Sequence, residues 1–149
     1  MRVRLKPLVG FAAIVAVCAG CVLPARSTDA FTGKALSTTT AAQSAVESAI
    51  LAAELAGHGR VTAAYVSVTF SDAEGDASAA QSAFDSIQPP NGASDRVRAQ
   101  LDPILSDAVD ALTSLRISAR RGDLDKLGPF VTDARAAARR LAAFQQANQ

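Results

Sequence analysis

The fold is decided by residues 66–87, which read VSVTFSDAEGDASAAQSAFDSI. Apolar residues recur in this stretch at alternating steps of four and three, which is the heptad spacing of a helix that packs along one face. The positions on this face are Val66, Phe70, Ala73, Ala77, Ala80, Phe84 and Ile87. The part at 61–70, VTAAYVSVTF, is rich in β-branched residues and taken alone is typical of a strand. Because the register continues unbroken to Ile87, we predict a helix throughout.

The segment before this helix shows the same spacing from about residue 38. Thr40-x-x-Gln43 has the pattern of a capping box at a helix start. The helix is expected to end at Gly57-His58-Gly59, because glycine tolerates the left-handed backbone that follows a helix. Its apolar stripe consists of Ala42, Val46, Ala49, Ile50 and Ala53.

Two more helical segments follow the loop at residues 88–92. Ser94 or Asp95 is expected to cap the first of them, and Gly122-Asp123 separates it from the second. Pro103 lies inside the first segment, so the helix either kinks there or restarts with Asp102 as its N-cap. Gly128-Pro129 predicts a further bend near the start of the last segment. The two apolar faces consist of Val97, Leu101, Ile104, Ala108, Ala111 and Leu115, and of Leu127, Phe130, Ala134, Ala137, Leu141 and Phe144.

The length and composition limit the fold to one small helical domain. The chain has 149 residues, of which 49% are hydrophobic and only 5% aromatic. Four amphipathic segments joined by short turns favour an all-α fold, an antiparallel four-helix bundle. Alanine at many of the apolar positions predicts closely spaced helices and a thin core. We expect this bundle domain to span residues 38–149.

The first twenty residues have the organisation of an export signal. Arg2, Arg4 and Lys6 precede an uncharged run from Leu8 to Gly20, which is too short to span a membrane. The run ends in Cys18-Ala19-Gly20-Cys21, which resembles the lipobox of bacterial lipoproteins. Cys18 stands where that family usually has leucine.

The resemblance implies both lipid modification of a cysteine and removal of the signal peptide. In that family the thiol at the position of Cys21 is acylated, and the signal peptide (residues 1–20) is removed after the small residues Ala19 and Gly20. Residues 21–37 would then form the lipidated cysteine and a flexible tether. A soluble secreted protein cut by ordinary signal peptidase and an uncleaved anchor remain alternatives. The remainder of the chain resembles the small Ala/Arg-rich lipoproteins of high-GC bacteria in composition alone.

The sequence offers little material for catalysis or metal binding. His58 is the single histidine, and its glycine-flanked turn favours an ordinary loop residue. Di-iron bundles require two Glu-x-x-His pairs, which one histidine cannot supply. Asp72-x-Glu74-Gly75-Asp76 has the composition of a calcium loop but lacks the glycine and glutamate that an EF-hand needs later, so we expect these carboxylates to lie on a solvated helix face. We therefore predict no catalytic residues, no metal site, no cofactor and no enzymatic activity.

Charge is distributed unevenly along the chain. Residues 37–95 carry seven acidic residues against Arg60, a net charge of −6, whereas residues 116–140 carry seven basic against three acidic residues, a net charge of +4. One interpretation is weak pairing between acidic and basic helices within the molecule. The other is a basic docking surface for anionic head groups or an acidic partner. Its candidate residues are Arg116, Arg120, Arg121, Arg135, Arg139 and Arg140.

These observations predict an exported, lipid-anchored helical bundle that acts as a non-catalytic binding or scaffold module at the outer face of the cytoplasmic membrane. Its expected partners are membrane lipid, through acylated Cys21, and an unknown protein of the cell envelope. Nucleic acid is not expected, because the chain lacks an aromatic stacking platform. An alternative is a carrier of a small apolar ligand. It predicts a cavity beneath Phe70, Phe84, Phe130 and Phe144.

Overall fold

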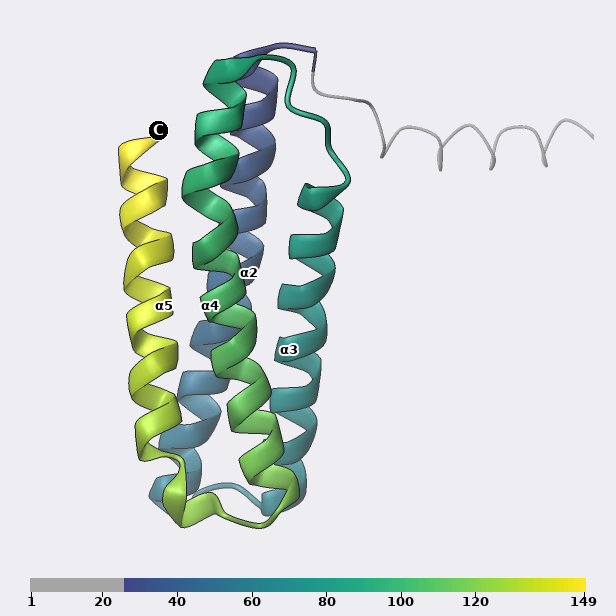
Figure 1. Cartoon of the computed structure of the whole chain (residues 1–149). Helices are drawn as coiled ribbons and strands as arrows, with labels where there is room; N and C mark the ends of the chain where they lie inside the picture. Colours follow the sequence, from purple (N-terminus) through teal and green to yellow (C-terminus); the bar gives the residue numbers. More distant parts are fainter. Residues whose placement is uncertain (1–25) are drawn as a thin grey trace, which may run out of the picture.

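A computed structural model describes residues 26–149 and shows an antiparallel bundle of four long helices (Figure 1). The helices are α2 (Thr28–Gly57), α3 (Ala63–Asp85), α4 (Gly92–Arg120) and α5 (Gly128–Ala147), with a short 3₁₀ helix, η2 (Leu124–Lys126), before the last. Each helix packs against the next, α5 closes the ring against α2, and α2 also touches α4 across the centre. The predicted all-α bundle is confirmed.

The heptad face of α3 forms part of the core, as its spacing predicts. Val66, Phe70, Ala73, Ala77 and Phe84 are buried, while Ala80 and Ile87 are half-buried. The strand-like beginning of this segment is helical, with the side chain of Thr62 capping the backbone N–H of Tyr65 at 3.2 Å. The large side chains Tyr65 and Val68 point away from the core and are exposed. Burial of one face therefore outweighs the local β-propensity.

Helix α2 begins ten residues earlier than the predicted boundary at residue 38. Ser27 is its N-cap and accepts a hydrogen bond from the backbone N–H of Ala30 at 3.2 Å. The predicted capping box is wrong, because the Thr40 hydroxyl donates to the Leu36 carbonyl at 3.0 Å in mid-helix. The expected flexible tether is wrong for residues 28–37. The core stripe extends back through this region to Phe31, Ala35 and Thr39, all fully buried.

The start of α4 also differs from the prediction. Asn91, not Ser94 or Asp95, is the N-cap, and its side-chain oxygen accepts from the backbone N–H groups of Ala93 and Ser94 at 3.1 Å. The Asn91 amide also donates to the Thr28 hydroxyl at 2.9 Å, which fastens the start of α4 to the start of α2. Helix α4 continues through Pro103 without restarting at Asp102. Pro103 is exposed, so water can solvate the carbonyl that its ring leaves unpaired.

The turn between α4 and α5 depends on one glycine. Gly122 has φ +79°, a left-handed conformation that other residues adopt only with strain. The expected bend at Gly128-Pro129 is instead the start of α5, where proline is favoured because the first helical N–H groups have no intrahelical partner. Helix η2 occupies the residues between these two glycines. This turn and the α2–α3 turn lie at one end of the bundle, opposite the start of α2 (Figure 1).

Two glycine substitutions test this description. Gly33 lies within α2, and the space that an added Cβ atom would occupy is open, so Gly33→Ala should raise the free energy of unfolding by about 0.5–1 kcal/mol. Gly122→Ala should lower it by about 1–2 kcal/mol, because only its positive φ opposes the change. Chemical denaturation followed by circular dichroism measures both. No effect of Gly33→Ala would indicate that residues 28–37 are not helical.

Candidate functional site

The six arginines of the predicted basic surface come from two helices and differ in their ion pairing. Arg116, Arg120 and Arg121 lie at the end of α4, whereas Arg135, Arg139 and Arg140 lie along α5. Three of the six are ion-paired with acidic residues of other helices: Arg116 with Glu74, Arg135 with Glu54 at 2.6 Å, and Arg140 with Asp107. The interhelical pairing that the charge distribution suggested is therefore present. Within residues 26–149, Arg120, Arg121 and Arg139 make no ion pair.

The pair between Glu74 and Arg116 joins α3 to α4. Both side chains are mostly shielded, at 19% and 24% exposure, and the Thr113 hydroxyl donates to the same carboxylate at 2.8 Å. Burial by itself raises the pKa of Glu74, but the hydrogen bonds from Arg116 and Thr113 outweigh it and hold this pKa below its ordinary value of 4.5. The sequence suggested that Glu74 was solvated together with Asp72 and Asp76. In the structure only the two aspartates are exposed.

Replacing Glu74 should change how stability depends on pH. Because its pKa is lower in the folded state, ionised Glu74 stabilises the fold above pH 4.5, and this contribution is lost as the pH falls through the lowered value. Glu74→Gln should reduce the free energy of unfolding by about 1–2 kcal/mol at pH 7 and by less near pH 3. Denaturation between pH 3 and pH 7 measures this. The exposed Glu47 gives the matched control, Glu47→Gln, and equal profiles would contradict the prediction.

Arg98 is a half-buried arginine that sequence reasoning missed. It lies on α4 and donates to the backbone carbonyls that end α3: to Phe84 at 3.2 Å, to Asp85 at 3.3 Å and to Ile87. Its guanidinium carbon lies 5.1 Å from the ring centroid of Phe84 and 5.7 Å from that of Phe31. This arginine therefore satisfies helix-end carbonyls and holds α2, α3 and α4 together.

Asp102 lies one turn after Arg98 on α4. Burial raises the pKa of Asp102 above its ordinary value, and nearby Asp85 raises it further, while Arg98 partly offsets the shift. Its Oδ1 atom is buried and has no hydrogen-bond partner. The half-buried carboxyl lies in the interior of a continuous helix, so it is a local cost to stability rather than the N-cap that the sequence suggested.

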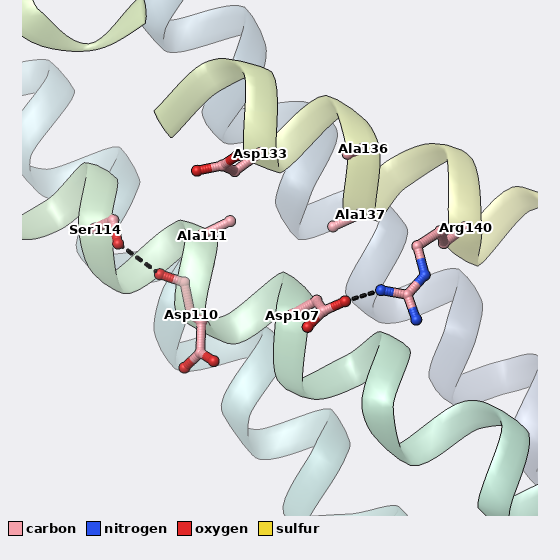
Figure 2. Close-up of a pocket in the computed structure, with 8 residues that line it drawn as sticks. All are labelled: Asp107, Asp110, Ala111, Ser114, Asp133, Ala136, Ala137 and Arg140. Atoms are coloured by element: carbon pink, nitrogen blue, oxygen red, sulfur yellow. Dashed lines mark hydrogen bonds and ion pairs between the residues drawn. The ribbon is translucent and has the colours of Figure 1, made fainter. Parts of the chain in front are cut away.

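An open groove of about 300 Å³ lies between α4 and α5. Asp107 and Asp110 line its α4 side, and Asp133 and Arg140 project from α5 (Figure 2). The Asp107–Arg140 ion pair crosses the groove, and Ser114 donates its hydroxyl to the Asp110 backbone carbonyl at 2.9 Å. No local sequence pattern indicated this groove, because its carboxylates come from two helices. Residues 26–149 contain no group of three or more His, Cys, Asp or Glu side chains placed to hold a metal ion.

A second pocket, of about 470 Å³, lies beside the α4–α5 turn. We call it the distal pocket because it lies at the end of the bundle opposite the start of α2. Its lining includes the apolar residues Ile117, Pro129 and Phe130 and the cations Arg121 and Lys126. Lys126 is paired with Asp123 at 2.8 Å, and hydrogen bonding to Asp123 raises the pKa of this lysine. Of the six predicted arginines, only Arg121 lines this pocket.

The remaining predicted sites have the following positions. His58 is exposed at the C-cap of α2, where its Nδ1 atom lies 2.7 Å from the Glu54 backbone carbonyl oxygen. Cys18, Ala19, Gly20 and Cys21 lie outside the residues that the structure describes. From residue 26 onward, none of the helices is long and apolar enough to cross a membrane. The chain matches no family model, no curated sequence and no solved structure.

Proposed function

We propose that this chain is an exported, lipid-anchored helical bundle that acts as a binding or scaffold module at the outer face of the cytoplasmic membrane. The observation that carries the proposal is the order of three sequence features: basic residues, a short apolar run, and the lipobox-like Cys18-Ala19-Gly20-Cys21. A helical domain then begins at Thr28. Membrane lipid is the first partner, through Cys21, and a protein of the cell envelope is the second.

The early start of α2 shortens the link between anchor and domain. Six residues, 22–27, separate Cys21 from Thr28 in place of the sixteen that the sequence suggested. Six residues span at most about 20 Å when fully extended. The thirty residues of α2 rise about 45 Å. A lipid-anchored bundle would therefore keep the start of α2 near the head groups, and an upright bundle would carry the opposite end well away from them.

Removing the thiol of Cys21 tests the proposal. Cys21→Ala should abolish incorporation of labelled palmitate and release the mature domain from the membrane fraction, because a lipid-modified cysteine would be its anchor. The matched control is Cys18→Ala, which removes the neighbouring thiol and should leave labelling intact. Labelling that persists in Cys21→Ala would contradict the proposal. If the unmutated chain is cleaved, unlabelled and found in the soluble fraction, the alternative of a soluble secreted protein is supported instead.

The carrier alternative is not favoured by the positions of the phenylalanines. Phe70 and Phe84 are fourteen residues apart on α3, and Phe130 and Phe144 are fourteen apart on α5. Each pair is therefore separated by about 21 Å along its helix, so the four rings cannot surround one small cavity. Phe84 packs on Phe31 with ring centroids 5.3 Å apart. Phe130 lines the distal pocket, which is open to solvent.

A further inference from the structure

The apolar residues that line the distal pocket come from the ends of two long helices. Ile117 comes from the last turn of α4, and Pro129 and Phe130 come from the first turn of α5. Phe130 is half-buried and packs against the core, while Ile117 remains 38% exposed. The packing of α4 and α5 therefore fixes the positions of these apolar residues. Part of their apolar surface still faces solvent.

Charged side chains lie beside these apolar residues, since Arg121, Lys126 and Asp123 all line the pocket. Arg121, the C-cap residue of α4, is exposed and makes no ion pair among the described residues, and Arg120 beside it is also exposed. Lys126 contributes a further cation, although Asp123 balances its charge. Residues 120–126 carry three basic residues, Arg120, Arg121 and Lys126, against Asp123 and Asp125, a net charge of +1. The surroundings therefore favour a ligand that is apolar at its centre and anionic on its flanks.

The shape of the pocket favours a peptide over a membrane surface. Proteins that bind at a lipid surface insert protruding apolar side chains between the head groups. Here the apolar residues line a pocket of about 470 Å³, which has room for a projecting side chain of a partner. The α4–α5 turn, beside which the pocket lies, is at the end of the bundle opposite the start of α2 (Figure 1). A partner protein approaching an anchored bundle would find this end accessible.

We propose that the distal pocket binds an acidic peptide segment of a partner protein. An apolar side chain of the segment packs on Ile117, Pro129 and Phe130, and flanking carboxylates pair with Arg121 and Arg120. The inference deepens the proposed binding role and depends on it, but it does not require lipidation of Cys21. It assigns different roles to the predicted arginines, since Arg116, Arg135 and Arg140 are engaged within the bundle.

A peptide selection tests this proposal without assuming a sequence. The full-length chain is immobilised in detergent micelles and presented with a phage library of random twelve-residue peptides. We expect enrichment of sequences that carry Leu, Ile or Phe between Asp or Glu residues. The affinity of an enriched peptide, measured by fluorescence anisotropy, should fall as the salt concentration rises. Enrichment of basic or uncharged sequences would overturn the proposal.

Variants then locate the binding site. Arg121→Gln and Ile117→Ser should each weaken binding of the enriched peptide by about fivefold to tenfold, which is the range for one charged or apolar contact. The matched control is Arg139→Gln, which removes an exposed arginine of α5 outside the pocket and should change affinity less than about twofold. Circular dichroism confirms that each variant is folded. Equal affinities for all three variants would overturn the assignment to the distal pocket.

Two further measurements separate peptide binding from lipid binding, and separate the distal pocket from the anchoring proposal. If dihexanoyl phosphatidylglycerol shifts the amide resonances around Ile117 and the selection yields no acidic peptide, the pocket takes lipid head groups and the proposal fails. The Cys21→Ala chain should bind the enriched peptide with unchanged affinity. A result in which lipidation fails but this affinity persists would therefore overturn the anchoring proposal alone and leave the distal pocket assigned.

Discussion

Replacing Phe31 with alanine should lower the free energy of unfolding by about 3–5 kcal/mol, the usual cost of removing a fully buried aromatic side chain. Phe31 has no exposed surface, and its ring lies 5.3 Å from that of Phe84 and beneath the guanidinium of Arg98. The substitution would leave a cavity where α2, α3 and α4 meet. Because small domains are stable by only about 5–15 kcal/mol, the midpoint of thermal unfolding should fall by roughly 10–20 °C.

Leu51→Ala gives a control on the same helix. Leu51 is 57% exposed, so its truncation should change stability by less than about 0.5 kcal/mol. Thermal and urea denaturation of the two variants, followed by circular dichroism, measure the difference. If Phe31→Ala were as stable as Leu51→Ala, residues 28–37 would not belong to the folded domain, and the sequence-based boundary at residue 38 would stand.

Arg98→Met should cost about 2–3 kcal/mol, the second largest effect that we expect. Methionine keeps much of the apolar stem but removes the donors that serve the carbonyls of Phe84, Asp85 and Ile87. It also removes the cation that lies over the two phenylalanine rings. The end of α3 would then have carbonyl groups without a protein partner.

The control for this prediction is Arg96→Met, because Arg96 is exposed two residues away on α4. Its effect should remain within about 0.5 kcal/mol. A double variant adds a sharper measurement: the effects of Phe31→Ala and Arg98→Met should sum to more than the effect of both together, because the two side chains share one contact. Strict additivity would show that the contact between Arg98 and Phe31 contributes nothing to stability.

Sequence periodicity predicted the number of helices and most of the buried positions. It failed at the first helix because residues 22–37 mix small, polar and apolar types, which are typical of a flexible segment. The signal that could have corrected this was the spacing Phe31, Ala35, Thr39, Ala42, which continues the stripe backwards with one threonine in it. The Thr39 hydroxyl is satisfied within the helix by the Ala35 carbonyl at 2.8 Å, so its burial costs little.

The candidate site was less predictable than the fold. Uneven charge along the chain predicted that acidic and basic helices would pair, but it could not show which arginines are engaged. That outcome depends on how each helix is rotated about its axis. Glu74 faces α4 and Arg116, while Asp72, half a turn away, is exposed beside α2. The distal pocket combines residues from two helices and the turn between them, so no local sequence pattern indicated it.

The even number of antiparallel helices has one further consequence. The chain enters and leaves the bundle at the same end, where α2 starts and where the C-terminus lies (Figure 1). A circularly permuted chain could therefore join Gln149 to the start of α2 through a short linker and open within the turn at Gly122. In the natural order of the helices, neither end of the domain obstructs the approach of another molecule to the distal pocket.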